Sequence, residues 1–294
     1  MSITPARHPI IPSIKRDTIL KLLKRGERID GRKLEDYRRI KVVINPIPKA
    51  EGSALVKLGN TVIMSGIKLE VGTPYSDRPN EGVLQVHAEF VPLASPTFEP
   101  GPPDENAIEV ARVIDRSLRE PRVIKLEDLV IVPGKRVWVI FNDLYLLDHD
   151  GNIIDAGMLS SILALNNTLI PSLIIESEEN IKVDREKREK PLPLNLNVVT
   201  VTIGIIDEYL LVDPTLEEEL LLDSRLIFAV DENNRIVGFQ KTGYKGIKTR
   251  IFEDALELAL RKARELHELV KKVLNNPNEF IKPSLAIEDL WGQD

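Results

Sequence analysis

The chain has 294 residues, of which 43% are hydrophobic and 29% are charged, proportions that are ordinary for a globular protein of one or two domains. It contains no cysteine, so disulfide bonds, thiolate metal sites and cysteine nucleophiles are excluded. The formal net charge of -6 argues against a protein that coats nucleic acid over its whole surface, but it leaves room for a local basic groove.

Membrane proteins and zinc proteins are also disfavoured. No stretch reaches the roughly 18 consecutive apolar residues of a membrane span, and lysines and arginines interrupt any signal-peptide core near the N-terminus. We therefore expect a soluble, cytoplasmic protein. A zinc site is not expected, because no metal-ligand spacing joins the four histidines, His8, His87, His149 and His267.

The basic N-terminal part of the chain is predicted to start with one helix and to continue with strands. Residues 11–25 have apolar side chains on one helical face and lysines on the other. The sequence Gly-Glu-Arg-Ile-Asp-Gly-Arg then occupies 26–32. Gly59-Asn60 indicates a hairpin turn, and strands are predicted at 41–47, 53–58, 61–66 and 83–91.

The clearest helix of the first half follows a rigid break. Pro100-Gly101-Pro102-Pro103 stops the preceding structure, and Asp104 is a good N-cap. One face of the helix carries the apolar residues Val110, Val113, Ile114 and Leu118. Because successive side chains turn by about 100°, the opposite face carries the arginines Arg112, Arg116 and Arg119.

Strands and helices alternate through the rest of the chain. Strands are predicted at 129–132, 137–146, 198–206, 209–212, 226–230 and 236–240. Helices are predicted at 156–166 and, as a long amphipathic element, at 252–274. Residues 176–190 are dense in charges of both signs and poor in apolar residues, which is typical of a surface excursion or linker.

These elements divide the chain into two halves, each with strands followed by helices, which indicates an α+β (α/β layered) fold with mixed sheets. The division that we predict is an N-terminal helical segment at 1–30, a first half at 31–175, a charged linker at 176–195, a second half at 196–275 and a C-terminal tail at 276–294.

Several short motifs, taken in order and spacing, resemble the phosphorolytic exoribonucleases of the RNase PH family over about residues 26–270. The motif at 26–32 is similar to the family's Gly-x-Arg-x-Asp-Gly-Arg sequence. The family's strand and helix signatures are matched by Gly52-Ser53-Ala54, Gly59-Asn60-Thr61 and Arg116-Ser117-Leu118-Arg119. The resemblance implies an RNase PH-like fold, with halves like ribosomal protein S5 domain 2.

Within that family, the stretch at 98–109 and Asp213-Pro214, which a Glu-rich turn follows, are most similar to the non-catalytic ring subunit of the archaeal exosome. This resemblance implies a hexameric ring of three heterodimers with RNA threaded through the centre. A catalytic RNase PH-like partner would degrade single-stranded RNA from its 3′ end with inorganic phosphate and a divalent cation. RNA-binding cap proteins are further expected partners, and no cofactor is expected in this chain itself.

The chain departs from the pattern of the active members at three places. Asn106 stands where they have an arginine, and Gly151-Asn152-Ile153-Ile154 replaces their Gly-Gly-Ser/Thr-Arg phosphate loop, with Ile154 at the place of the arginine. The third departure is milder, because Glu217 and Asp223 fall where active members have two aspartates six residues apart, so the acidic pair is partly kept. Phosphorolysis brings two anions together and needs fixed cationic and N–H donors. We therefore expect no catalytic residue in this chain.

The arginine row has two interpretations. The resemblance implies that Arg112 and Arg116, with Arg119 as a weaker candidate, bind RNA phosphates, for which guanidinium groups are suited. The alternative is a solvated helix face on which Glu109 pairs with Arg112. For Glu217 and Asp223 the alternative is an ordinary acidic surface turn. For Arg28, Asp30 and Arg32 we favour a structural cluster of salt bridges.

Three functions are compatible with this sequence. The first is the non-catalytic ring subunit that supplies Arg112 and Arg116 to its partner's active site. The second is a self-sufficient phosphorolytic 3′→5′ exoribonuclease, supported by Glu217 and Asp223 and opposed by Asn106 and Ile154. The third is an RNA-associated scaffold without an exonuclease partner, which the acidic net charge disfavours.

Overall fold

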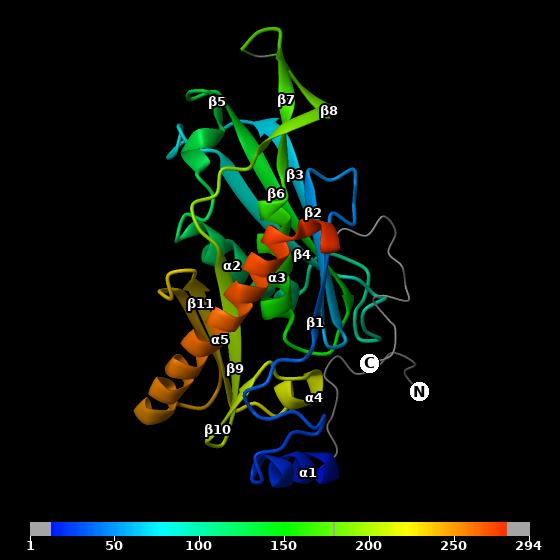
Figure 1. Ribbon diagram of the computed structural model, residues 1–294, viewed down its shortest axis with the longest axis vertical. Coiled ribbons are helices and arrows are strands. Elements are labelled where there is room, and N and C mark those ends of the chain that lie inside the picture. Colours follow the sequence, from blue (N-terminus) through cyan, green and yellow to red (C-terminus); the bar gives the residue numbers. More distant parts are fainter. Residues whose placement is uncertain (1–12, 179, 281–294) are drawn as a thin grey trace.

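The computed structural model describes residues 13–178 and 180–280 (Figure 1). The first half consists of α1 (Ser13–Leu23), β1 (Ile40–Ile44), β2 (Gly52–Leu58), β3 (Thr61–Gly72), β4 (Val83–Phe90), α2 (Glu105–Arg119), a 3₁₀ turn η1 (Leu126–Leu129), β5 (Val130–Val132), β6 (Arg136–Asp148) and α3 (Ile153–Asn166). The second consists of β7 (Leu169–Ile175), β8 (Ile181–Pro191), β9 (Val198–Ile206), β10 (Tyr209–Val212), α4 (Leu216–Glu219), β11 (Ser224–Asp231), β12 (Ile236–Gly243), α5 (Thr249–Asn275) and η2 (Pro277–Glu279).

Each half contributes one main sheet. The first has the order β1-β2-β3-β6-β4, with β5 paired to β6, and only its β4–β6 pair is parallel. The second is an antiparallel sheet of order β10-β9-β11-β12. The predicted hairpin is present between β2 and β3, where Gly59 supplies a positive φ of 58°. The α+β fold predicted from the sequence is confirmed.

Helix α3 lies between the two sheets and joins the halves into one core. It packs on β2 and β3 of the first sheet and on β9 of the second, and its residues from Ile154 to Leu165 are buried. A helix covered on both sides must be apolar around its whole circumference, which explains why its sequence shows little amphipathic pattern. Helix α5 covers β9 and β11, as its amphipathic pattern predicted.

The segment predicted as a charged linker differs in the structure. Residues 181–191 form β8, which pairs with β7 in a two-stranded antiparallel sheet, and this hairpin projects from the body at the top of Figure 1. Its base is tied down by Arg185, whose Nη1 donates to the buried Glu51 at 2.6 Å. The strand is dense in charged residues, several of them exposed, so its composition resembles that of a linker. The surface excursion is therefore a strand hairpin.

Several predicted elements shift only at their ends. Strands β3 and β6 are longer than predicted, and α3 begins at Ile153 rather than near 156. Helix α1 agrees with the N-terminal helix that we predicted. Residues 1–12 of the N-terminal segment, His8 among them, and residues 281–294 of the predicted tail lie outside the described residues.

The segment after α1 is fixed to the second half by buried ion pairs. Arg28, which is 2% exposed, binds both carboxylate oxygens of Glu218 in α4 and donates to the carbonyl oxygen of Val212 at 2.7 Å. Arg32 pairs with Asp30 at 2.7 Å and with Asp213 at 3.0 Å. The structural cluster of Arg28, Asp30 and Arg32 that the sequence favoured is thus confirmed.

Asp213 is the centre of this network. Its side chain is fully buried and accepts a bidentate pair from Arg38, with Nε at 2.8 Å and Nη2 at 2.7 Å. It also accepts from the amide of Asn152, at the start of α3, at 2.7 Å. One carboxylate therefore holds the N-terminal segment, the second sheet and α3 in register.

We expect Asp213→Asn to lower the free energy of unfolding by about 3 kcal/mol or more, because Arg38 and Arg32 would lose the charge that compensates them in a buried place. Urea unfolding followed by circular dichroism measures the change. Asp30→Asn is the matched control, since Asp30 also pairs with Arg32 but is exposed, and it should change the free energy by under about 1 kcal/mol. Equal losses in both variants would contradict the central position of Asp213.

Candidate functional site

Helix α2 presents the arginine row that the sequence predicted. The helix begins at Asp104, whose carboxylate accepts from the backbone N–H of Ala107 at 2.8 Å, as a good N-cap does. Its apolar face is buried on the first sheet and α3, including Val110, Val113, Ile114 and Leu118. Burial of that face fixes the rotation of the helix, so Arg112 and Arg116 are exposed on the other side.

The three arginines of this row have different surroundings. Arg112 makes no hydrogen bond or ion pair within residues 13–178 and 180–280, and Glu109 pairs elsewhere, so the predicted alternative of a Glu109–Arg112 pair is wrong. Arg116 donates from Nη2 to the side-chain oxygen of Gln240 at 3.1 Å. Arg119 is half-buried, binds Asp115 at 2.5 Å and donates to the carbonyl oxygen of Leu84 at 2.8 Å.

These contacts separate Arg119 from the other two arginines. Its charge is compensated by Asp115, and the hydrogen bond with that carboxylate raises the pKa of the Arg119 guanidinium. Arg112 has no acidic partner in the described structure, and the bond recorded for Arg116 is with a neutral amide. Two cations with uncompensated charge are better suited to phosphate than one that is already paired, so the geometry favours Arg112 and Arg116.

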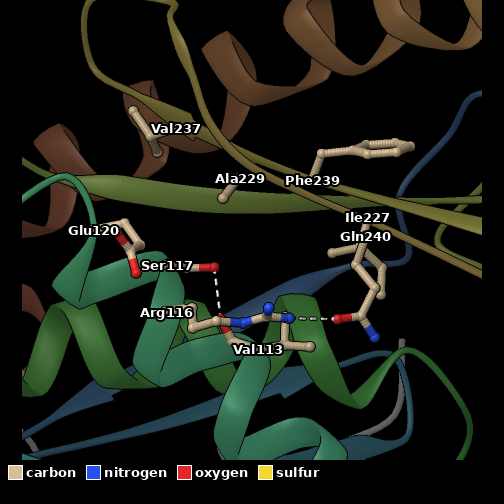
Figure 2. Close-up of a pocket in the computed structure, with 10 residues that line it drawn as sticks. Val113, Arg116, Ser117, Glu120, Ile227, Ala229, Val237, Phe239 and Gln240 are labelled. Atoms are coloured by element: carbon tan, nitrogen blue, oxygen red, sulfur yellow. Dashed lines mark hydrogen bonds between the residues drawn. The ribbon is translucent and has the colours of Figure 1, made fainter.

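A groove runs beside this row, between α2 and the edge strand β12 (Figure 2). It encloses about 240 Å³. Its floor is made by Val113 and Ser117 of α2 and by Ile227 and Ala229 of β11. The ring of Phe239 is directed away from α2 in Figure 2, and it packs at a tilt against Phe228 of β11 and edge-on against Phe252 of α5. The polar groups at the groove are therefore those of Arg116 and its neighbours.

The turn at the N-terminus of α3, for which the sequence predicted a lost phosphate loop, is covered by the chain's own residues. Ile154 is 2% exposed and belongs to the core. The backbone N–H of Asn152 donates to the carboxylate of Glu219 at 3.0 Å. A β-carbon at Gly151 would lie 2.5 Å from the backbone nitrogen of Leu216, which shows how closely the α4 segment covers this turn.

Acidic groups crowd the same turn. Burial raises the pKa of Glu219, against the opposing effect of Arg225 and the Asn152 N–H. Burial likewise raises the pKa of Asp155 to about 6, although hydrogen bonds from Thr202 and Asn152 oppose it. The side-chain oxygen of Asn152 is buried without a hydrogen-bond partner in the described part of the chain, and it is an acceptor that adds no N–H donor for phosphate oxygens. The backbone N–H and the side-chain amide of Asn152 are thus occupied by carboxylates of the chain itself.

His149 precedes the turn. Burial, with a smaller contribution from the nearby Arg38 charge, lowers its pKa to about 4, and its ring stacks on Phe98 with the centroids 5.4 Å apart. It is neutral at physiological pH and has a structural environment. His87 is exposed, with Nδ1 3.3 Å from Asp143. Neither imidazole adjoins the arginine row through a recorded contact.

The remaining predicted site residues are dispersed. Asn106 is exposed at the start of α2 and donates to Asp104 at 3.3 Å. Asp223 accepts from Lys245 at 2.7 Å and from the backbone N–H of Asp207 at 2.8 Å. Desolvation works to raise the pKa of Asp223, but these partners outweigh it and lower the pKa. Glu217 is half-buried in α4.

The sequence placed the divalent cation at the partner's site, and the acidic residues of this chain can be compared with what such a site requires. A cation site needs several oxygen ligands that converge on one point. Within the described ranges, no group of three or more acidic or histidine side chains is placed to hold a metal ion, and Asp223 is already bound to an ammonium group. Glu217 and Asp223 therefore do not fit a divalent cation.

Sequence reasoning missed the residues that close the α3 turn and hold the arginine row. Arg38, Asp213 and Glu219 form or border the buried network, and Gln240 is the partner of Arg116. From the sequence, Asp213-Pro214 was used only as a family motif, and Asp213 was given no structural role. Arg38 offers no local signal, because its partners lie more than a hundred residues away along the chain.

Comparisons with known proteins agree with this architecture. Residues 36–171 match domain 1 and residues 197–262 match domain 2 of the 3′ exoribonuclease family. The chain is 49% identical over 274 residues to exosome complex component Rrp42 of Aeropyrum pernix, an alignment that covers 93% of this chain and 99% of the relative.

Solved structures of exosomes are similar as well. A chain of the Archaeoglobus fulgidus exosome with RNA bound to the active site is 43% identical, with a TM-score of 0.78 over 87% of this chain and 97% of that one. A chain of an archaeal exosome core is 39% identical, with a TM-score of 0.76 over 88% and 97%. Both family domains, in the same order and on the same fold, are thus present, and the chain belongs to the RNase PH, or 3′ exoribonuclease, family.

Proposed function

We propose that this chain is a non-catalytic ring subunit of an exosome, which binds single-stranded RNA and helps to structure the active site of a catalytic RNase PH-like partner. The observation that carries the proposal is the difference between the N-terminal turn of α3 and the exposed face of α2. The α3 turn is closed by carboxylates of its own chain, whereas Arg112 and Arg116 are exposed and their charges are uncompensated in the described structure.

This contrast supports a division of the chemistry in which phosphate is bound by the partner and RNA is bound by both chains. Phosphate attack on an RNA 3′ end requires a site that holds phosphate with fixed cationic and N–H donors. The partner would supply that site in a ring of three heterodimers, with cap proteins as further RNA-binding components. Arg112 and Arg116 would bind RNA phosphates without reading sequence, because backbone contacts position a strand and carry no base information.

Two similarities support this proposal. The relatives of this chain are exosome components, and one structural neighbour comes from an exosome that holds RNA. No helix in the described part of the chain is long and apolar enough to cross a membrane. The rival function, a self-sufficient exoribonuclease, needs Glu217 and Asp223 to act on a phosphate that the α3 turn has no means to hold.

The function is tested by phosphate-dependent release of nucleoside diphosphates from the 3′ end of a single-stranded RNA. We expect the purified chain to release none, because it has no phosphate cradle, and an equimolar mixture with its RNase PH-like partner to be active. Light scattering should report the ring in the mixture. Release by the chain alone would favour the self-sufficient enzyme. A partner that is active by itself, does not bind this chain and is no more active in its presence would favour the scaffold.

The arginine pair is tested within the assembled ring. Arg112→Glu/Arg116→Glu should raise KM for RNA by about tenfold or more, since two attractive phosphate contacts become repulsive, while the ring stays intact. Arg250→Glu/Arg264→Glu is the control, because it reverses two charges on the exposed face of α5 and should leave KM within about twofold. Unchanged RNA affinity in the α2 variant would contradict the role of this pair.

A further inference from the structure

The polar groups around Arg116 form a continuous chain that leads from the arginine row to the closed α3 turn. Arg116 donates to the side-chain oxygen of Gln240 at 3.1 Å, and Gln240 donates from Nε2 to Glu109 at 2.8 Å. Figure 2 shows the first of these bonds at one end of the groove. The elements involved, α2 and β12, lie more than a hundred residues apart in sequence, so the tertiary fold creates the contact.

Beyond Glu109 the chain of contacts continues through one more arginine. Arg225 of β11 lies 3.5 Å from Glu109 and 3.5 Å from Glu219. Glu219 is the carboxylate that accepts from the backbone of the α3 turn. Arg225 therefore lies between two carboxylates, one at the buried turn and one beside Gln240, and the strongest contact that Gln240 itself makes is its 2.8 Å hydrogen bond to Glu109.

The chemistry of Gln240 decides its amide orientation and its effect on Arg116. Its NH₂ group must face the carboxylate of Glu109 and its oxygen must face the guanidinium. The reverse orientation would place two acceptors against each other at Glu109 and two donors against each other at Arg116. An amide oxygen orients a guanidinium but does not neutralise it. Arg119, three residues further along α2, shows the contrast, because its partner is the carboxylate of Asp115.

We propose that Gln240, held by Glu109, is a positioning residue that orients the Arg116 guanidinium toward RNA while leaving its positive charge available. This inference rests on the proposed function, since it assigns a cause to the orientation of one of the two RNA-binding arginines. A neutral partner in this position keeps a full unit of charge for the phosphate. An acidic partner would keep the geometry and remove most of the attraction.

Two variants of Gln240 separate orientation from charge. Gln240→Leu removes the acceptor but leaves the arginine charged, so KM for RNA should rise about three- to tenfold with kcat unchanged. The slope of the logarithm of the RNA binding constant against the logarithm of salt concentration should also stay unchanged. Gln240→Glu places a carboxylate beside Arg116, so KM should rise and that slope should become smaller by about 0.7, the value for one lost phosphate contact on a single strand.

Controls separate a specific effect of Gln240 on Arg116 from a general effect of altering an edge strand. Gln85→Leu makes the same chemical change on the edge strand β4 of the other sheet and should leave KM and the salt slope unchanged. Light scattering confirms that every variant still assembles with the partner. A merely structural role of Gln240 would lower the unfolding midpoint and leave the salt slope of Gln240→Glu equal to that of the unmodified chain.

The outcomes also distinguish this inference from the function on which it rests. If Arg116→Glu weakens RNA binding while both Gln240 variants bind like the unmodified chain, the positioning role is wrong and the RNA-binding role of α2 stands. If Arg116→Glu and both Gln240 variants all bind RNA normally, the RNA-binding role of Arg116 and the positioning role both fail. The inference is supported only by the combination of a raised KM in both variants and a reduced slope in Gln240→Glu alone.

Discussion

The carboxylate of Asp213 is the interaction on which the arrangement of this molecule depends. It is fully buried and receives Arg38 through two parallel hydrogen bonds, with Arg32 and the amide of Asn152 as further donors. A buried charge persists only when its partners are well placed, so this carboxylate dictates where three separate segments must meet. If the N-terminal segment, α3 and the end of β10 moved apart, a buried charge would become exposed to solvent or lose its partner.

That constraint has a chemical consequence at the α3 turn. The N-terminus of a helix is ordinarily a place where an anion is stabilised by N–H groups and by the helix dipole. Here the anion is already present, since Glu219 accepts from the turn and Asp213 holds the amide of Asn152. The donors at this helix end therefore stabilise the chain's own fold. The exposed cations Arg112 and Arg116 lie on α2 instead.

Much of this architecture follows from local sequence patterns. The N-cap at Asp104, the buried face of α2 and the hairpin at Gly59 are local events of a few residues, and each was predictable. Strand β8 was not, because its exposed charges imitate a linker and only pairing with β7 makes it a strand. Helix α3 begins earlier than its pattern indicated, because contacts from α4 fix its first turn.

The site was predictable to a smaller degree. The position of Arg112 and Arg116 on one exposed face follows from helical geometry, whereas Arg119 turns back to Asp115 for reasons that periodicity does not contain. Ile154, at the position where the resemblance implied an arginine, indicated that a cation is missing. It did not indicate that the carboxylate of Glu219 would accept from the turn. Gln240 and Glu219 reach the site from the second half of the chain, so only the tertiary structure reveals them.

The central claim is that the α3 turn is closed to phosphate. Titration of the isolated chain with inorganic phosphate, followed by ³¹P NMR at neutral pH and by isothermal calorimetry, tests it most directly. The account predicts no saturable binding at the turn, and any weak binding that is observed should disappear in Arg112→Glu/Arg116→Glu. Saturable binding of one phosphate per chain that survives in that variant would contradict the account.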